Sequence, residues 1–220
     1  MLTESLLHTA CLAGAYAALF GSAEWLYHRL RTVAEVTRKY VHIVTGLLTL
    51  LFPPLIGNHW LVGGLCGGFL LILFASLRFG WLPSINGVDR QTRGSLLYPI
   101  TVYACYLAYA LFDNASFYYL PILVLALADP VAALLGKAYP RGRYRLLGHT
   151  KTLSGSLAFF GVALLVGSVV LLPQSYPITQ VVYTALGVAT ATTLAEAVSH
   201  KGYDNLTIPL AAAVALALLN

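Results

Sequence analysis

The groups best suited to chemistry lie between residues 128 and 160, in ADPVAALLGKAYPRGRYRLLGHTKTLSGSLAFF. A carboxylate, Asp129, comes first, inside an apolar run. Five cations follow within about two dozen residues, and they are Lys137, Arg141, Arg143, Arg145 and Lys151. A carboxylate that can hold a divalent cation, followed by Lys and Arg side chains, supplies groups that bind a phosphate ester. This stretch is therefore a candidate anion site.

Glycines accompany these charges and would let the backbone approach a ligand closely. They are Gly136, Gly142, Gly148 and Gly155. The segment KTLSGS begins a helix with Thr152 and Ser156 in its first turns, so free backbone N–H groups and the helix dipole favour an anion there. The spacing does not match G-x-x-x-x-G-K-[ST] and no strand precedes it, which excludes a P-loop fold.

The basic stretch has three readings: a solvated loop, a patch for anionic lipid headgroups, or a nucleotide site. The nucleotide site accounts for the carboxylate, the glycines and the helix start, which the other two do not require. A nucleic-acid partner is not expected, because the cations lack an exposed aromatic platform. A transporter would carry polar residues to both faces of the membrane, whereas here they stop at one.

Ionisable groups also lie within apolar helices. Asp129 and Glu196 are each expected about two turns from the cytoplasmic end of a helix, where burying an ionisable group is costly and function is the default hypothesis, with a structural ion pair as the alternative. His42 shares a helix face with Arg38, at i and i+4, and is either a packed histidine or part of an anion-facing cluster. His149, among cations, is a candidate phosphate contact.

The elements that position these residues are predicted to be membrane helices. The chain has 220 residues, 59% of them hydrophobic and 10% charged, where a soluble domain has about 25% charged. Runs of roughly 20 apolar residues suit a bilayer. They predict an all-α, polytopic bundle forming one domain (1–220) with about eight spans, at 5–23, 40–56, 60–79, 96–112, 116–136, 152–173, 178–198 and 206–220.

The placement of charge predicts how this bundle is oriented. All 13 Lys and Arg residues fall in or beside the connections 24–39, 80–95, 137–151 and 199–205, which lie on one side of the predicted membrane. The positive-inside rule makes that side cytoplasmic and both termini non-cytoplasmic. The chemistry is therefore expected at the cytoplasmic face. The three cysteines lie in apolar runs and predict neither a zinc site nor a disulfide framework.

Four segments resemble a known family. They are RKYVHI (38–43), RGSLLYPI (93–100), DPVAALLGK with KTLSGSLAFF (129–137 and 151–160), and LAEAVSHKGYDNLTIPL (194–210). In this order and spacing they are similar to the CTP-dependent polyprenol kinases, which include dolichol, phytol and farnesol kinases and are related to the CTP-dependent diacylglycerol kinase. The resemblance covers residues 37–210. The loop PRGRYRLLGHT is longer and richer in Arg than expected for a phytol kinase and is somewhat closer to the loop of a dolichol kinase, which leaves the acceptor alcohol open.

This resemblance implies a site. It implies that nucleotide phosphates and Mg²⁺ are bound by Asp129, Gly136, Lys137, Lys151, Thr152, Gly155 and Ser156. It places around the same cytoplasmic site Arg38, Lys39, His42, Arg93, Glu196, Asp204 and Asn205. We expect Mg²⁺ on Asp129 or Asp204, phosphates on the lysines with Arg93 or Arg145, and Glu196 or Asp129 as the base, so that Asp129, Glu196 and Lys151 carry the catalysis.

The expected function is phosphorylation of a membrane isoprenoid alcohol, such as phytol, geranylgeraniol or a polyprenol, with CTP as donor. A CTP-dependent diacylglycerol kinase, a membrane cytidylyltransferase, or a lipid-binding or transport protein are the alternatives. The carboxylate-rich segment K-D-x-x-x-x-x-x-G-H-G-G-x-x-D-R-x-D, which resembles the cytidylyltransferases, does not occur. The lack of a clear transit peptide favours the inner membrane of a prokaryote, and an oligomer is compatible with the sequence.

Overall fold

The computed structural model describes residues 2–87 and 93–219. The chain divides into two compact units, unit 1 (residues 1–107) and unit 2 (residues 108–220). Asp89 and Arg90, which the sequence places on the cytoplasmic side, lie outside the described residues. The prediction of one domain over the whole chain stays a prediction.

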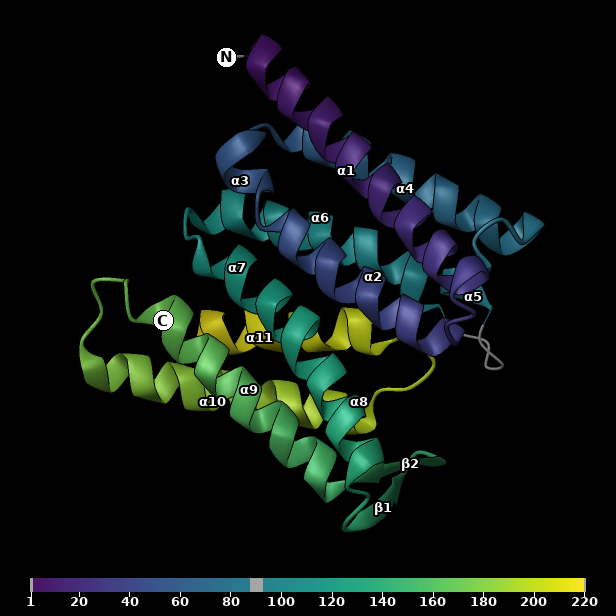
Figure 1. Ribbon diagram of the computed structural model, residues 1–220. Coiled ribbons are helices and arrows are strands. Elements are labelled where there is room, and N and C mark those ends of the chain that lie inside the picture. The colour runs from purple at the N-terminus through teal and green to yellow at the C-terminus, as the bar shows by residue number, and fades with distance from the viewer. Residues whose placement is uncertain (1, 88–92, 220) are drawn as a thin grey trace. The chain divides into compact units, whose positions relative to one another are not determined.

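Unit 1 is helical throughout most of its described residues. In chain order its helices are α1 (Leu2–Arg29), α2 (Ala34–Thr49), α3 (Phe52–Leu55), α4 (His59–Phe79), α5 (Pro83–Asn86) and α6 (Gly94–Phe112), the last of which continues into unit 2. Helix α1 packs against α2 and α4 (Figure 1). Asn58 begins α4 by accepting the N–H of Trp60 at 2.9 Å, and Gly80 ends it in the left-handed region at φ 71°. Such caps satisfy groups that a helix end leaves without a partner.

The elements of unit 2 are mostly helices, with one hairpin. They are α7 (Ser116–Leu123), a π-helical turn η1 (Val124–Ala128), α8 (Asp129–Ala138), strands β1 (Arg143–Leu146) and β2 (His149–Thr152), α9 (Leu153–Leu171), α10 (Ile178–Val198) and α11 (Asp204–Leu219). Helix α9 packs against α8 and α10, and α10 packs against α11 (Figure 1). The hairpin joins the end of α8 to the start of α9.

The prediction of an all-α, polytopic membrane protein is confirmed at the level of fold class. Among the described residues, six helices are long and apolar enough to span a membrane, taking α7, η1 and α8 together as Ser116–Ala138. Two predicted spans differ. Span 40–56 falls on α2 and the short α3, and span 206–220 falls on α11, which has 16 residues. These two spans and the positions of the termini relative to the membrane stay predictions.

Two predicted connections are also more ordered than the sequence indicates. The sequence predicts a loop over residues 24–39, but α1 continues to Arg29 and α2 begins at Ala34. The predicted loop 137–151 contains the last residues of α8 and most of the β1–β2 hairpin. In both places polar residues form regular structure at a helix end, which a search for long apolar runs does not detect.

Candidate functional site

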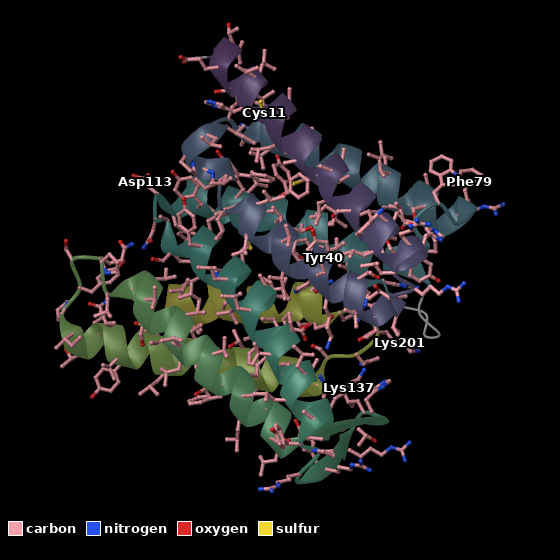
Figure 2. All side chains as sticks on the ribbon, viewed as in Figure 1. Cys11, Tyr40, Phe79, Asp113, Lys137 and Lys201 are labelled. Carbon is pink, nitrogen blue, oxygen red and sulfur yellow. The ribbon has the colours of Figure 1, made fainter. Side chains whose placement is uncertain are left out.

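The residues of unit 2 that the sequence predicts for the site gather at one end of its helices. Here α8 ends, the hairpin folds, α9 begins, α10 ends and α11 begins. In Figure 2, Lys137 and Lys201 lie at this end, and Asp113 lies at the opposite end of the same unit. That this end lies at one face of the membrane, and that the chemistry takes place there, stay predictions.

The hairpin arranges the basic residues on two faces. Its strands pair Tyr144 with Lys151 and Leu146 with His149. Because side chains alternate along a strand and directly paired residues share a face, these four residues lie on one face. Arg143 and Arg145 lie on the other face and are exposed. Of the predicted phosphate contacts in the hairpin, Lys151 and His149 therefore face the same way, and Arg145 and Thr152 face the opposite way.

The turn of the hairpin explains why it is compact. Leu147 and Gly148 both have positive φ, at 47° and 83°, as the central residues of a type I′ turn require. Gly142 also has positive φ, at 62°, and a Cβ there would lie 2.8 Å from the Cβ of Leu153. These two glycines therefore shape the hairpin and its junction with α9.

Lys151 and Glu196 form the central contact of this end of the unit. The Lys151 ammonium donates to the main-chain oxygen of Glu196 at 2.9 Å and pairs with its carboxylate Oε1. The Glu196 side chain is only 7% exposed, and that of Lys151 is 24% exposed. The other carboxylate oxygen, Oε2, is buried with no hydrogen-bond partner in the described structure. Glu196 lies two residues before the end of α10, not two turns from it as predicted.

Two histidines stack beside this ion pair. The rings of His149 and His200 lie 4.5 Å apart and almost parallel, at 18°. Partial desolvation, followed by the charge on His200, lowers the pKa of His149 below its usual 6.5. Three cations add to this effect, namely Lys201, Lys151 and Arg145. A neutral His149 can accept or donate one hydrogen bond according to its tautomer.

The first backbone N–H groups of α9 are bonded to groups of the same chain. The Thr152 hydroxyl accepts the N–H of Gly155 at 3.1 Å, and the Leu153 N–H bonds to the Gly142 carbonyl at 3.0 Å. The Ser154 N–H also has a carbonyl partner, at 3.5 Å. The expectation of free N–H groups at this helix start is therefore wrong, because the hairpin and the cap use them. The helix dipole still favours an anion here, and the Thr152 hydroxyl, which accepts one hydrogen bond, can still donate its own proton.

Two of the predicted phosphate-binding glycines lie at the contact of α8 with α9. A Cβ on Gly136 would lie 2.8 Å from Thr152 Oγ1, and one on Gly155 would lie 3.0 Å from the Ala132 carbonyl. The Ser156 hydroxyl bonds to the Tyr144 hydroxyl at 2.6 Å. These residues hold α8, the hairpin and α9 together, so each has a positioning role whether or not it touches a ligand.

Asp129 and Lys137 lie on the same helix. Asp129 is the first residue of α8 and is half-buried, and Lys137 is exposed in the last turn. Eight residues separate them, which is about 12 Å along a helix. The π-helical turn ends immediately before Asp129 and Pro130, whose missing N–H cannot bond to the preceding turn. Such turns often occur at functional sites.

The magnesium ligands predicted from the sequence both begin helices. Asp204 is half-buried at the start of α11, where its Oδ1 accepts the N–H of the buried Asn205 at 3.0 Å. Among the described residues, no three His, Cys, Asp or Glu side chains form a group that could hold a metal alone. Mg²⁺ bound with a nucleotide needs one or two carboxylates, with phosphates and waters completing its shell. The oxygen donors Asp129 and Asp204 fit that requirement.

The remaining predicted residues belong to unit 1. Arg38 lies within α2 and bonds through Nη2 to both carboxylate oxygens of Glu35, at 3.2 and 3.3 Å. The His42 ring meets the Tyr98 ring edge-on, with centroids 5.0 Å apart. Lys39 is half-buried on α2, and Arg93 is exposed just before α6. Their participation in the same site as the unit 2 residues stays a prediction.

Sequence reasoning missed Tyr144 and His200. Tyr144 is the cross-strand partner of Lys151, and His200 stacks on His149. Alternation in RYRL and HTKT could have indicated Tyr144, if the segment had been read as a hairpin. No local pattern indicates His200, because its partner lies 51 residues away in the sequence.

A comparison with known proteins identifies a relative of this chain. The chain is 35% identical over 206 residues to a phytol kinase of Synechocystis sp., an alignment that covers 92% of this chain and 88% of that protein. No protein-family model matches the chain. No solved structure matches it either.

Proposed function

Because this chain belongs to the family of polyprenol and phytol kinases, and is therefore a phosphotransferase, we propose that it transfers the γ-phosphoryl group of CTP to the primary hydroxyl of a membrane isoprenoid alcohol. Its similarity to a phytol kinase supports an acceptor such as phytol or geranylgeraniol. The observation that carries the site is the Lys151–Glu196 pair. It holds a cation of the basic hairpin against a buried carboxylate at one end of the membrane helices.

The reaction needs three events at this end of the unit. The alcohol oxygen attacks the γ-phosphorus, the bond from that phosphorus to the bridging oxygen breaks, and CDP leaves. The hydroxyl proton passes to a carboxylate. We assign the role of base to Glu196, because its Oε2 is buried without a protein partner among the described residues. Asp129 is the alternative base, as the sequence already indicated.

Binding of the phosphates falls to the hairpin and the ends of α8 and α9. Lys151 and His149 share a hairpin face, and we place them on the phosphates as a point charge and a hydrogen-bond partner. Lys137 adds a second point charge from α8. The Thr152 and Ser156 hydroxyls and the dipole of α9 complete the anion site. Arg145 faces the other way and would contact a phosphate that extends past the hairpin.

Magnesium would be held by Asp129 or Asp204 together with the phosphates. When bound, Mg²⁺ neutralises the charge that develops on the phosphoryl oxygens. The alcohol's hydrocarbon tail stays in the bilayer, so that the hydroxyl meets the donor at the cytoplasmic face. The cations of this end support that orientation, since short loops rich in Lys and Arg remain cytoplasmic.

A product assay tests the proposal. Purified protein in detergent receives Mg²⁺, labelled CTP and one acceptor from a panel of phytol, geranylgeraniol, longer polyprenols and diacylglycerol. We expect CDP and a lipid monophosphate with an isoprenoid alcohol. Release of pyrophosphate would instead identify a cytidylyltransferase, and turnover with diacylglycerol alone would identify a diacylglycerol kinase.

The nucleotide is tested in the same assay. Parallel reactions with ATP, GTP and UTP measure donor preference, which we expect to favour CTP. Equal rates with ATP would contradict the choice of donor while leaving the kinase reaction in place. Folded protein that consumes no nucleotide with any acceptor would contradict the proposed reaction as a whole.

A further inference from the structure

Unit 1 contains buried hydroxyl groups that no protein atom satisfies among the described residues. Tyr98 and Thr101 on α6 are 7% and 3% exposed, and neither hydroxyl has a hydrogen-bond partner in the described structure. Both side chains are therefore more than nine-tenths buried and carry an unsatisfied polar atom. They are three residues apart, so they lie on the same face of α6, one turn after the other.

Helix α2 contacts α6 at one of these residues and carries further unsatisfied groups. His42 contacts Tyr98 ring to ring, and Thr45 follows His42 by one turn. The hydroxyl of Thr45 and the Nε of Arg38 are also buried without a partner among the described residues. Arg38, His42 and Thr45 have the spacing i, i+4 and i+7, which is one helix face. We call these residues, with Tyr98 and Thr101, the α2–α6 seam.

An unsatisfied hydroxyl in this position destabilises the fold. Removing a hydroxyl from water without giving it a new hydrogen bond is unfavourable, and a bilayer core offers no water as a substitute partner. Phe in place of Tyr98 and Val in place of Thr101 would fill nearly the same volumes without that cost. The seam is therefore less stable than an apolar contact of the same shape, and a ligand that bonds to these hydroxyls would offset the difference.

We infer that the α2–α6 seam binds the hydroxyl group of a membrane lipid alcohol. The seam's unsatisfied groups are mainly neutral hydroxyls, which suit a neutral hydroxyl better than a phosphate. The charged end of Arg38 is already bonded to Glu35. Tyr98 and Thr101 lie four and seven residues after the start of α6, about 6 and 10 Å along the helix. A lipid alcohol can place its hydroxyl at that depth while its tail stays in the bilayer.

The lipid's identity rests on the proposed function, whereas binding can be measured without any reaction. The experiment follows thermal unfolding of the full chain in detergent, without nucleotide, in the presence of phytol or of phytane, a saturated hydrocarbon of the same carbon skeleton without the hydroxyl. We expect phytol to raise the Tm of the wild type and phytane to leave it unchanged. Phytol titration gives the apparent affinity.

Two substitutions remove the hydroxyls with little change in shape. For Tyr98→Phe and for Thr101→Val, we expect an unchanged or slightly higher Tm without lipid, by about 2 °C at most. We also expect an affinity for phytol about 3- to 10-fold weaker, as the loss of one neutral hydrogen bond predicts. Tyr103→Phe is the matched control, since Tyr103 is on the same helix outside the seam, beside Gly63.

Several results would overturn this inference. Equal stabilisation by phytol and phytane, or none by either, would show that the hydroxyl is not recognised. A Tm that falls in both Tyr98→Phe and Thr101→Val without lipid would show that their hydroxyls already bond to protein or ordered water. Unchanged phytol affinity in both variants would show that these two hydroxyls do not bind the lipid. If phytol does not bind through these hydroxyls but CDP is still formed, the inference about the seam is wrong and the proposed kinase reaction is retained. If CDP is not formed but phytol still binds, the proposed reaction is wrong and the inference about the seam is retained.

Discussion

The ammonium group of Lys151 bonds twice to one residue, donating to the main-chain oxygen of Glu196 at 2.9 Å and to its carboxylate. The contact fixes strand β2 to the end of α10, across 45 residues of sequence. It also gives a buried carboxylate one positive partner, while Oε2 stays without one in the described structure. One pair thus holds the hairpin in place and leaves a carboxylate oxygen for an incoming group.

Breaking this pair from one side should cost stability as well as activity. In Lys151→Met, the buried carboxyl group of Glu196 loses its positive partner, and we expect a loss of about 2–4 kcal/mol in the free energy of unfolding. The double variant Lys151→Met/Glu196→Gln removes both charges and should recover most of that loss, but no activity. Denaturant unfolding in mild detergent and the CDP assay measure the two quantities.

Lys201→Met is the control for this cycle, because Lys201 is exposed and lies at the same end of unit 2. It should leave stability within about 0.5 kcal/mol of the wild type. Wild-type turnover by a folded Lys151→Met protein would exclude Lys151 from phosphate binding. A double variant no more stable than Lys151→Met would show that the pair does not act as a unit.

Asp129 should be needed for chemistry rather than for folding. Asp129→Asn keeps the shape of the side chain and removes its charge, and we expect a rate lower by about 10²–10³ with little change in Tm. Asp113→Asn is the matched control at the opposite end of unit 2, and Asn tolerates the positive φ of 49° there. The measurement is CDP formation at saturating Mg²⁺ and CTP. Equal rates for the two variants would remove Asp129 from the site.

The sequence predicts the long helices of this protein well, because crossing a bilayer requires about 20 apolar residues in a row. It predicts α2 less well. Because its first turns contain Glu35, Arg38 and Lys39, the sequence predicts a loop there, although Glu35 and Arg38 are spaced to pair along a helix. A search for long apolar runs does not detect a helix whose first turns are polar and lie at the membrane surface.

The contacts of the site are harder to predict than its residues. Lys151 and Glu196 both stand out in the sequence, yet no sequence pattern links two residues 45 positions apart. The sequence does not predict the hairpin, because its turn is Leu147-Gly148 and not Asn-Gly, the dipeptide that usually indicates a two-residue hairpin turn. The glycines stand out as close-approach positions, but Gly136 and Gly155 face each other's helices, which spacing alone does not indicate.

The α8–α9 contact predicts opposite effects for two helical glycines. In Gly136→Ala the new Cβ would lie 2.8 Å from Thr152 Oγ1, so the helices must move apart or the cap must break. We expect a loss of about 1–3 kcal/mol in unfolding free energy, together with lower activity. Gly161→Ala on α9 meets nothing within 4 Å and should gain up to about 1 kcal/mol from helix propensity. Thermal unfolding of both variants checks this, and equal effects would contradict the close contact.

The stacked histidines predict a specific dependence of stability on pH. Because partial desolvation, His200 and nearby cations lower the pKa of His149, the folded protein takes up a proton there less readily than the unfolded chain. The stability present at neutral pH is therefore lost as the pH falls through the usual histidine pKa of 6.5, down to the lowered value in the folded state. Melting temperatures between about pH 8 and pH 5 should fall more steeply for the wild type than for His149→Gln. Removing the neighbouring charge with His200→Gln should reduce the slope in part. Parallel curves for wild type and His149→Gln would show that His149 takes up its proton equally readily in the folded and unfolded chain.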